Sequence, residues 1–98
     1  MTITKEKNDN VLNLALEGRL DTVTAPQLEE VVNSELEGVS ELNFDFKSLE
    51  YVSSAGLRVL LAAQKAMDKQ GGMVIKNVCP EILEVFEITG FSDILTIA

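Results

Sequence analysis

Two adjacent serines stand where an apolar, strand-like segment passes into the longest helical pattern of the chain. Ser53 and Ser54 follow a strand expected over residues 41–46 and precede a helical stripe that runs from 57 to about 69. The first backbone N–H groups of a helix lack intrahelical partners and carry partial positive charge, which favours a serine hydroxyl or a phosphate there. The pair can therefore cap the helix or serve as a modification site.

The local pattern alone does not decide between these two roles. A plain N-cap, worth about 1 kcal/mol, is the simpler interpretation of the serines. Gly56 favours a role beyond capping, because a glycine in the first helical turn costs about 1 kcal/mol relative to alanine and usually permits another group to approach closely. Tight packing of the helix on a sheet explains this glycine equally well. Asp21 and Asp45 are by default a loop residue and an exposed strand residue, and the sharper hypothesis makes them an acidic rim around the serines.

The composition argues against an enzyme, a metal site and a nucleotide site. The chain has no histidine, so a Ser-His-Asp triad is impossible and the commonest general base is missing. Its one cysteine, Cys79, has no partner for a zinc site, and no glycine-rich nucleotide motif is present. We expect no cofactor, no metal and no catalytic residue. An enzyme with Ser54 as nucleophile beside Asp21 is a rival hypothesis without a visible base.

The charge of the chain restricts its partners. Sixteen acidic against eight basic residues give a formal net charge of −8. Nucleic acid and anionic membrane surfaces are therefore unfavourable partners, whereas a basic patch on a protein would be attracted. No apolar run approaches the roughly 20 residues of a membrane span, and no signal-peptide pattern opens the sequence. A single cysteine fits a reducing compartment, so we expect a cytoplasmic protein.

The hydrophobic periodicity predicts one α/β domain over residues 1–98, with a mixed sheet and about three main helices. Strands are expected over 3–7, 11–16, 41–46, 73–75 and 94–97, and helices from Thr24 to near Gly38, over 57–69 and over 80–89. The order is β-β-α-β-α-β-α-β and opens with a hairpin around residues 8–10. Thr24 and Gln27 predict a capping box, residues 17–21 and 47–50 are expected to leave the sheet, and Gly90 is expected to stop the third helix. Loops 20–24 and 49–54 both follow strands, so they could bring Asp21, Ser53 and Ser54 together.

Three segments resemble the STAS domain family and, more narrowly, its bacterial anti-sigma factor antagonists. The first is Gly18-Arg19-Leu20-Asp21, followed by a helix that opens at Thr24. The second contains Phe44-Asp45-Phe46 and then Leu49-Glu50-Tyr51-Val52-Ser53-Ser54-Ala55-Gly56-Leu57-Arg58-Val59-Leu60-Leu61. The third is Gly90-Phe91 before the last expected strand. The similarity covers nearly the whole chain.

This resemblance implies a phosphorylation switch in partner binding. In the family, the serine two residues before the glycine is phosphorylated by the anti-sigma factor, which is itself a serine/threonine kinase; Ser54 matches that serine and Ser53 is the fallback. The unphosphorylated protein would bind the kinase and free a sigma factor, and a PP2C-type phosphatase would reverse the modification. The expected partner-binding residues are Asp21, Thr22, Ser53, Ser54, Ala55, Gly56 and Arg58. The alternative is a STAS binding module of another system, such as a signalling scaffold or an accessory subunit of a lipid transporter.

Overall fold

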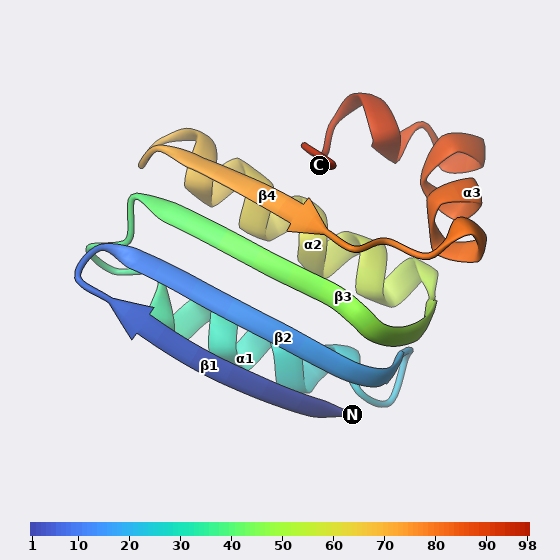
Figure 1. The fold of residues 1–98 in the computed structure, drawn as a ribbon, viewed down its shortest axis with the longest axis horizontal. Coiled ribbons are helices and arrows are strands. Elements are labelled where there is room, and N and C mark those ends of the chain that lie inside the picture. Colours follow the sequence, from blue (N-terminus) through green and yellow to red (C-terminus); the bar gives the residue numbers. More distant parts are fainter.

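A mixed sheet of four strands, in the order β1-β2-β3-β4, forms the frame of the computed structural model, which describes residues 1–98 (Figure 1). The strands are β1 (Thr2–Asn8), β2 (Val11–Leu20), β3 (Glu41–Val52) and β4 (Gly72–Lys76). β1 and β2 form an antiparallel hairpin, and β2, β3 and β4 run parallel. Asp9 lies in the hairpin turn with a φ of 55°, a left-handed conformation that Asp and Asn tolerate. The predicted opening hairpin and mixed sheet are confirmed.

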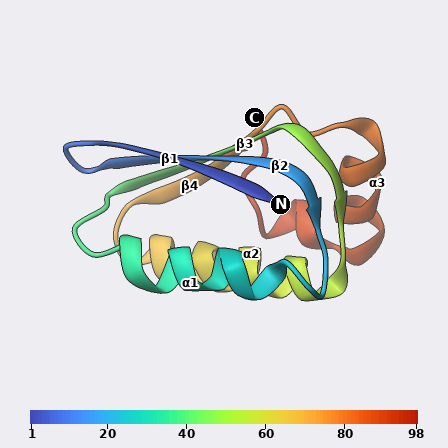
Figure 2. The same cartoon turned by 90° about the horizontal axis from the view of Figure 1, so that it is seen from below.

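The helices cover one face and one end of this sheet. α1 (Ala25–Glu35) and α2 (Ser54–Asp68) lie side by side under the same face, as Figure 2 shows. α3 (Pro80–Thr89) lies at the far end of β3 and leads into the short 3-10 helix η1 (Phe91–Asp93). The order β-β-α-β-α-β-α agrees with the prediction as far as α3. None of these helices has the length and apolar character that crossing a membrane requires.

The strand expected over residues 94–97 is reduced to a single bridge. Ile97 pairs in parallel with Ile75, and the Ile75 N–H donates to the Thr96 carbonyl at 2.9 Å. The residues before this bridge follow a different path, because the chain turns through η1 and buries Leu95 in the core. The apolar character of the segment therefore reflects core packing more than strand pairing.

Alternation along the strands separates a buried face from an open one. Leu12, Leu14 and Leu16 of β2 face the helices, as do the alternate residues of the neighbouring strands. The other fully buried residues on this face of β3 and β4 are Leu42, Phe44, Phe46, Met73 and Ile75. Polar side chains such as Asn13 and Asn43 lie on the opposite face, where their amides hydrogen-bond at 3.1 Å. A period of two in the sequence thus correctly predicted the buried faces of β2 and β3.

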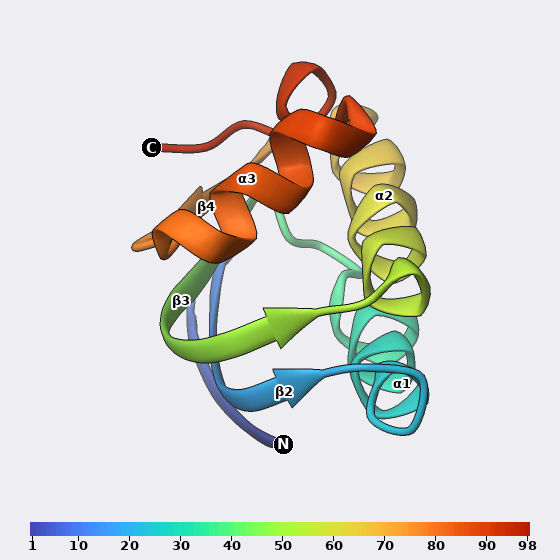
Figure 3. The same ribbon diagram turned by 90° about the vertical axis from the view of Figure 1, so that its right-hand side faces the viewer.

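β2 and β3 run further than the sequence pattern indicated. The expectation that residues 17–21 and 47–50 leave the sheet was wrong, because the two strands stay paired as far as Leu20 and Val52. The register shifts between Ala15 and Glu17 and again between Gly18 and Arg19. Such irregularities break strict alternation and bend a strand, and the two strands curve toward the helices in Figure 3. Gly18, with a φ of 104°, adopts the left-handed backbone that one shift requires.

The helix termini agree only in part with the predicted signals. Gly90 ends α3 in the left-handed conformation, with a φ of 82°, as predicted. The capping box of α1 is not formed, because the Thr24 hydroxyl donates to the Arg19 carbonyl and the Gln27 amide donates to the Met1 carbonyl. α1 also ends at Glu35, before Gly38, and α2 begins at Ser54, three residues before the first apolar position used to predict it.

Candidate functional site

The carboxyl ends of β2 and β3 place the serine segment beside the loop that opens α1. Leu20 pairs with Val52 in the parallel ladder, and the Ser53 N–H donates to the Leu20 carbonyl at 2.8 Å. Asp21 directly follows β2 and Ser53 directly follows β3, so both residues leave the sheet at the same edge. The predicted convergence of these two loops is therefore confirmed.

The two serines differ in what their hydroxyls do. Ser53 is the N-cap of α2, with extended backbone, and its Oγ accepts a hydrogen bond from the Gly56 N–H at 3.3 Å. Ser54 is the first residue of the helix, its side chain is exposed, and its hydroxyl makes no hydrogen bond within the protein. The capping role thus belongs to Ser53, which leaves the Ser54 oxygen accessible to another molecule.

Gly56 is the point where α2 touches the end of β2. A Cβ at this position would lie 2.6 Å from the Leu20 Cγ and 3.2 Å from the Leu20 carbonyl oxygen. Leu20 itself is fully buried. Of the two readings of this glycine, close packing on the sheet is therefore the one that the structure supports. The contact also fixes how near the first turn of α2 lies to the Asp21 loop.

Asp21 organises the loop between β2 and α1. Its Oδ1 accepts from the backbone N–H groups of Val23 and Thr24, both at 3.0 Å, and the Thr24 hydroxyl, whose single proton is shared with the Arg19 carbonyl, lies 3.2 Å away. These bonds, led by the Thr24 N–H, and the Arg19 guanidinium 3.8 Å away hold the pKa of the Asp21 carboxyl below its usual range. The main role of the carboxylate is therefore structural: it holds the loop in shape.

Asp21→Asn should reduce the loss of stability that the protein suffers in acid. Because the pKa of Asp21 is lowered in the folded state, its ionised form stabilises the fold above the unfolded pKa of about 3.9, and this contribution is lost as the pH falls through the folded pKa. Urea unfolding between pH 6 and pH 2.5, at about half-unit steps, gives the free energy of unfolding at each pH, and its slope against pH is the quantity that the linkage relation predicts. Asp93→Asn removes the same charge from an exposed side chain that accepts no hydrogen bond. Equal slopes for the two variants would contradict the role given to Asp21.

A hollow of about 250 Å³ opens between the first turns of α1 and α2. We call it the α1–α2 hollow; its lining residues are Thr22, Ala25, Pro26, Glu29, Ala55, Arg58 and Val59. Three of the predicted partner-binding residues, Thr22, Ala55 and Arg58, thus share one concave surface. Arg58 is exposed and lies within 4.0 Å of no carboxylate, so its charge is not paired within the protein.

Sequence reasoning missed two features of this end of the molecule. The Arg19 guanidinium lies over the Tyr51 ring, 4.2 Å from its centroid, in a cation–π contact. These residues are partners in the parallel ladder, which could be found only by extending both strands past their irregularities. Val23, 85% exposed, projects from the Asp21 loop as an apolar side chain that faces solvent. The sequence did contain a signal for this exposed side chain, because an apolar residue stands inside a turn bounded by Asp21 and Thr24.

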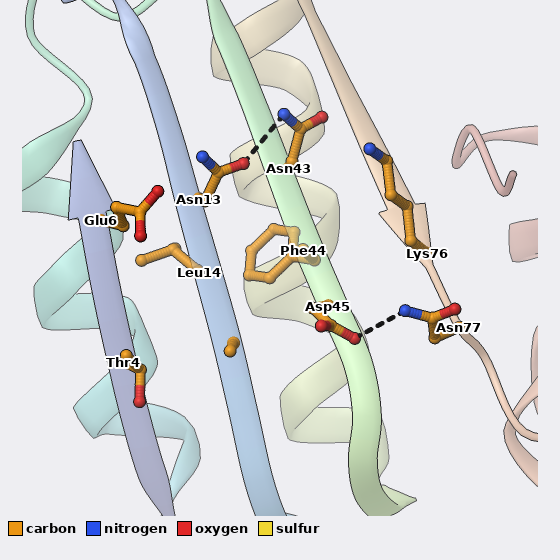
Figure 4. A pocket seen from close by; sticks show the side chains of 10 residues that line it. Thr4, Glu6, Asn13, Leu14, Asn43, Phe44, Asp45, Lys76 and Asn77 are labelled. Carbon is orange, nitrogen blue, oxygen red and sulfur yellow. Dashed lines mark hydrogen bonds between the residues drawn. The ribbon is translucent and has the colours of Figure 1, made fainter. Parts of the chain in front are cut away.

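Asp45 does not belong to this site: its default placement in a strand is confirmed, and the alternative hypothesis of an acidic rim that includes it was wrong. It lies within β3 on the open face of the sheet, in a shallow hollow of about 300 Å³ (Figure 4). Its Oδ1 accepts from the Asn77 amide at 3.0 Å and from the Lys47 N–H at 2.9 Å, and these two bonds lower the pKa of the carboxyl. Because Phe44 and Phe46 face the core, the residue between them must face the other way.

Comparisons with known proteins agree with this fold. A model of the STAS domain family matches residues 2–98. The protein BtrV of Bordetella bronchiseptica, provisionally named an anti-sigma factor antagonist, is 38% identical over all of this chain and 86% of its own. The anti-sigma-B factor antagonist of Bacillus subtilis is 31% identical over 95% of this chain and 86% of its own. The crystal structure of an anti-sigma factor antagonist from Mycobacterium paratuberculosis superposes with a TM-score of 0.87 at 26% identity and covers 98% of this chain and 83% of that one. The chain therefore belongs to the STAS domain family, in which these relatives carry the name of anti-sigma factor antagonists.

Proposed function

We propose that this protein is an anti-sigma factor antagonist whose binding is switched by phosphorylation of Ser54. In the unphosphorylated form it binds an anti-sigma factor serine/threonine kinase and thereby frees a sigma factor. The observation that carries the proposal is the division of roles between the serines. Ser53 uses its hydroxyl to cap α2, whereas Ser54 presents an unbonded, exposed hydroxyl on the first residue of that helix.

Three features at this end of the molecule support the binding of such a partner. They are the concave α1–α2 hollow, the exposed Val23 and the ordered Asp21 loop. The Ser53 N–H bond to the Leu20 carbonyl and the contact of Gly56 with Leu20 hold the two segments together, so little ordering is needed on binding. The net charge of −8 attracts a partner that carries a basic patch.

The kinase supplies the chemistry, and this chain supplies only the acceptor. The Ser54 oxygen attacks the γ-phosphorus of the ATP held by the kinase with Mg²⁺, the bond to ADP breaks, and a base of the kinase takes the hydroxyl proton. The phosphate formed at a helix start is stabilised by free backbone N–H groups and by the helix dipole. The exposure of Ser54 also leaves that phosphate open to a PP2C-type phosphatase, which would regenerate the binding form.

Phosphosite mapping tests this proposal. Incubated with ATP and the candidate anti-sigma factor kinases of the same organism, the wild-type protein should gain one phosphate at Ser54, detected by mass spectrometry. Ser54→Ala should still bind the kinase but gain none. Ser53→Ala should still be modified, with α2 weakened by the loss of its cap, which is worth about 1 kcal/mol. Full phosphorylation of Ser54→Ala would transfer the site to Ser53, and retrieval of a transporter subunit in place of a kinase would favour a binding module of another system.

A further inference from the structure

One unpaired positive charge lies a single helical turn from the proposed phosphorylation site. Ser54 and Arg58 are four positions apart in α2, so their Cβ atoms lie about 5–6 Å apart on the same side of the helix. Side chains of a helix lean toward its N-terminus, which directs the long Arg58 side chain back toward Ser54. Arg58 is exposed and forms no ion pair, so it can turn to a new anion without losing an existing carboxylate.

The other charges around the first turn of α2 leave Arg58 as the available cation. Arg19, at the end of β2, is already engaged with the Tyr51 ring and lies 3.8 Å from the Asp21 carboxylate. Lys65 belongs to the last turn of the same helix. From α1, only the Glu29 carboxylate lines the hollow with Arg58, and it forms no ion pair. A phosphate on Ser54 would therefore have the Arg58 guanidinium as its one unpaired cation, while the other nearby charges include the carboxylates of Asp21 and Glu29.

We propose that Arg58 binds the phosphate of phosphorylated Ser54 within the same helix. A guanidinium donates paired N–H groups to phosphate oxygens, and the order of anion before cation at this spacing also agrees with the helix dipole. Phosphorylation then acts on the partner surface in two ways: it adds negative charge at Ser54 and it withdraws the Arg58 guanidinium from the α1–α2 hollow. This inference depends on the proposed function only for the presence of a phosphate on Ser54.

The second ionisation of the phosphate reports this contact directly. Phosphoserine can be installed at position 54 by genetic encoding in the full chain, which removes any need for a kinase, and its titration followed by ³¹P NMR. The free group has a second pKa of about 6. Arg58→Gln should raise this pKa by about 0.15 to 0.4 unit relative to the unsubstituted phosphoprotein, because the dianion loses its nearest cation. Arg58→Lys should retain part of the effect, since it keeps the charge but loses the paired donors.

Lys65→Gln is the matched control, since it removes one positive charge from the same helix beyond the reach of Ser54. We expect it to leave the phosphate titration close to that of the unsubstituted phosphoprotein. If Arg58→Gln and Lys65→Gln give the same titration, the phosphate is held by the backbone at the helix start and the role of Arg58 is overturned. A kinase that fails to modify Ser54 would contradict the proposed function but would not change the titration, so the two failures are distinguishable.

Discussion

Ser54→Asp should weaken binding to the cognate anti-sigma factor kinase by more than about tenfold. A unit charge placed about 4 Å from a like charge, such as a carboxylate of the partner or a phosphate of its ATP, costs about 4 kcal/mol at an effective dielectric of 20. Half of that after screening still exceeds the 1.4 kcal/mol that corresponds to about one decade in affinity. The fold should be retained, because an acidic side chain on the first turn of a helix is favourable.

Ser53→Asp is the control that separates position from charge. Aspartate caps a helix about as well as serine, and at position 53 its carboxylate faces the Gly56 N–H that the serine oxygen now accepts from. The same charge one residue away should therefore reduce the affinity far less. Isothermal titration with the kinase at low and at high salt measures both variants, and the loss in Ser54→Asp should shrink as salt screens the repulsion. Equal losses of affinity for the two variants would show that the partner responds to the total charge of this surface and not to a charge at position 54.

The elements of the fold were predictable wherever local backbone chemistry decides their limits. α3 begins and ends as predicted because Pro80 suits the first turn of a helix and Gly90 adopts the left-handed conformation that ends it. The buried faces of β2 and β3 were predictable for the same reason, since side chains of a strand alternate. Both inferences depend on interactions within a few residues, and those are present in the sequence itself.

The site was harder to predict because it depends on pairing between distant segments. The bulged ends of β2 and β3 lack regular alternation, and only their mutual register shows that Arg19 and Tyr51 are neighbours. The roles of the two serines depend on where α2 begins, and an apolar stripe that starts at Leu57 does not place that boundary within one residue. Their local pattern therefore left open whether the serines cap the helix or serve as a modification site, and it did not show which of them does the capping.

Gly56→Ala should destabilise the fold by about 1–2 kcal/mol, which corresponds to a fall of roughly 4–16 °C in Tm for a domain of this size. The new methyl group would lie 2.6 Å from the Leu20 Cγ and 3.2 Å from the Leu20 carbonyl oxygen, which also accepts the Ser53 N–H. Leu20 is fully buried and cannot swing into solvent. The gain of about 1 kcal/mol in helix propensity offsets only part of this overpacking.

Gly72→Ala is the matched control for this prediction, because a Cβ at Gly72 meets no atom within 4 Å and its backbone is not left-handed. Thermal unfolding should show a change near zero for Gly72→Ala and a clear loss for Gly56→Ala. Adding Leu20→Ala to Gly56→Ala should cost at least about 0.5 kcal/mol less than the sum of the single changes, because the smaller side chain relieves the contact. Because that contact sets the distance between the first turn of α2 and the Asp21 loop, Gly56→Ala should also slow phosphorylation of Ser54 while the chain is still folded. A Gly56→Ala protein as stable as the wild type would show that the packing at Leu20 does not hold these two segments together.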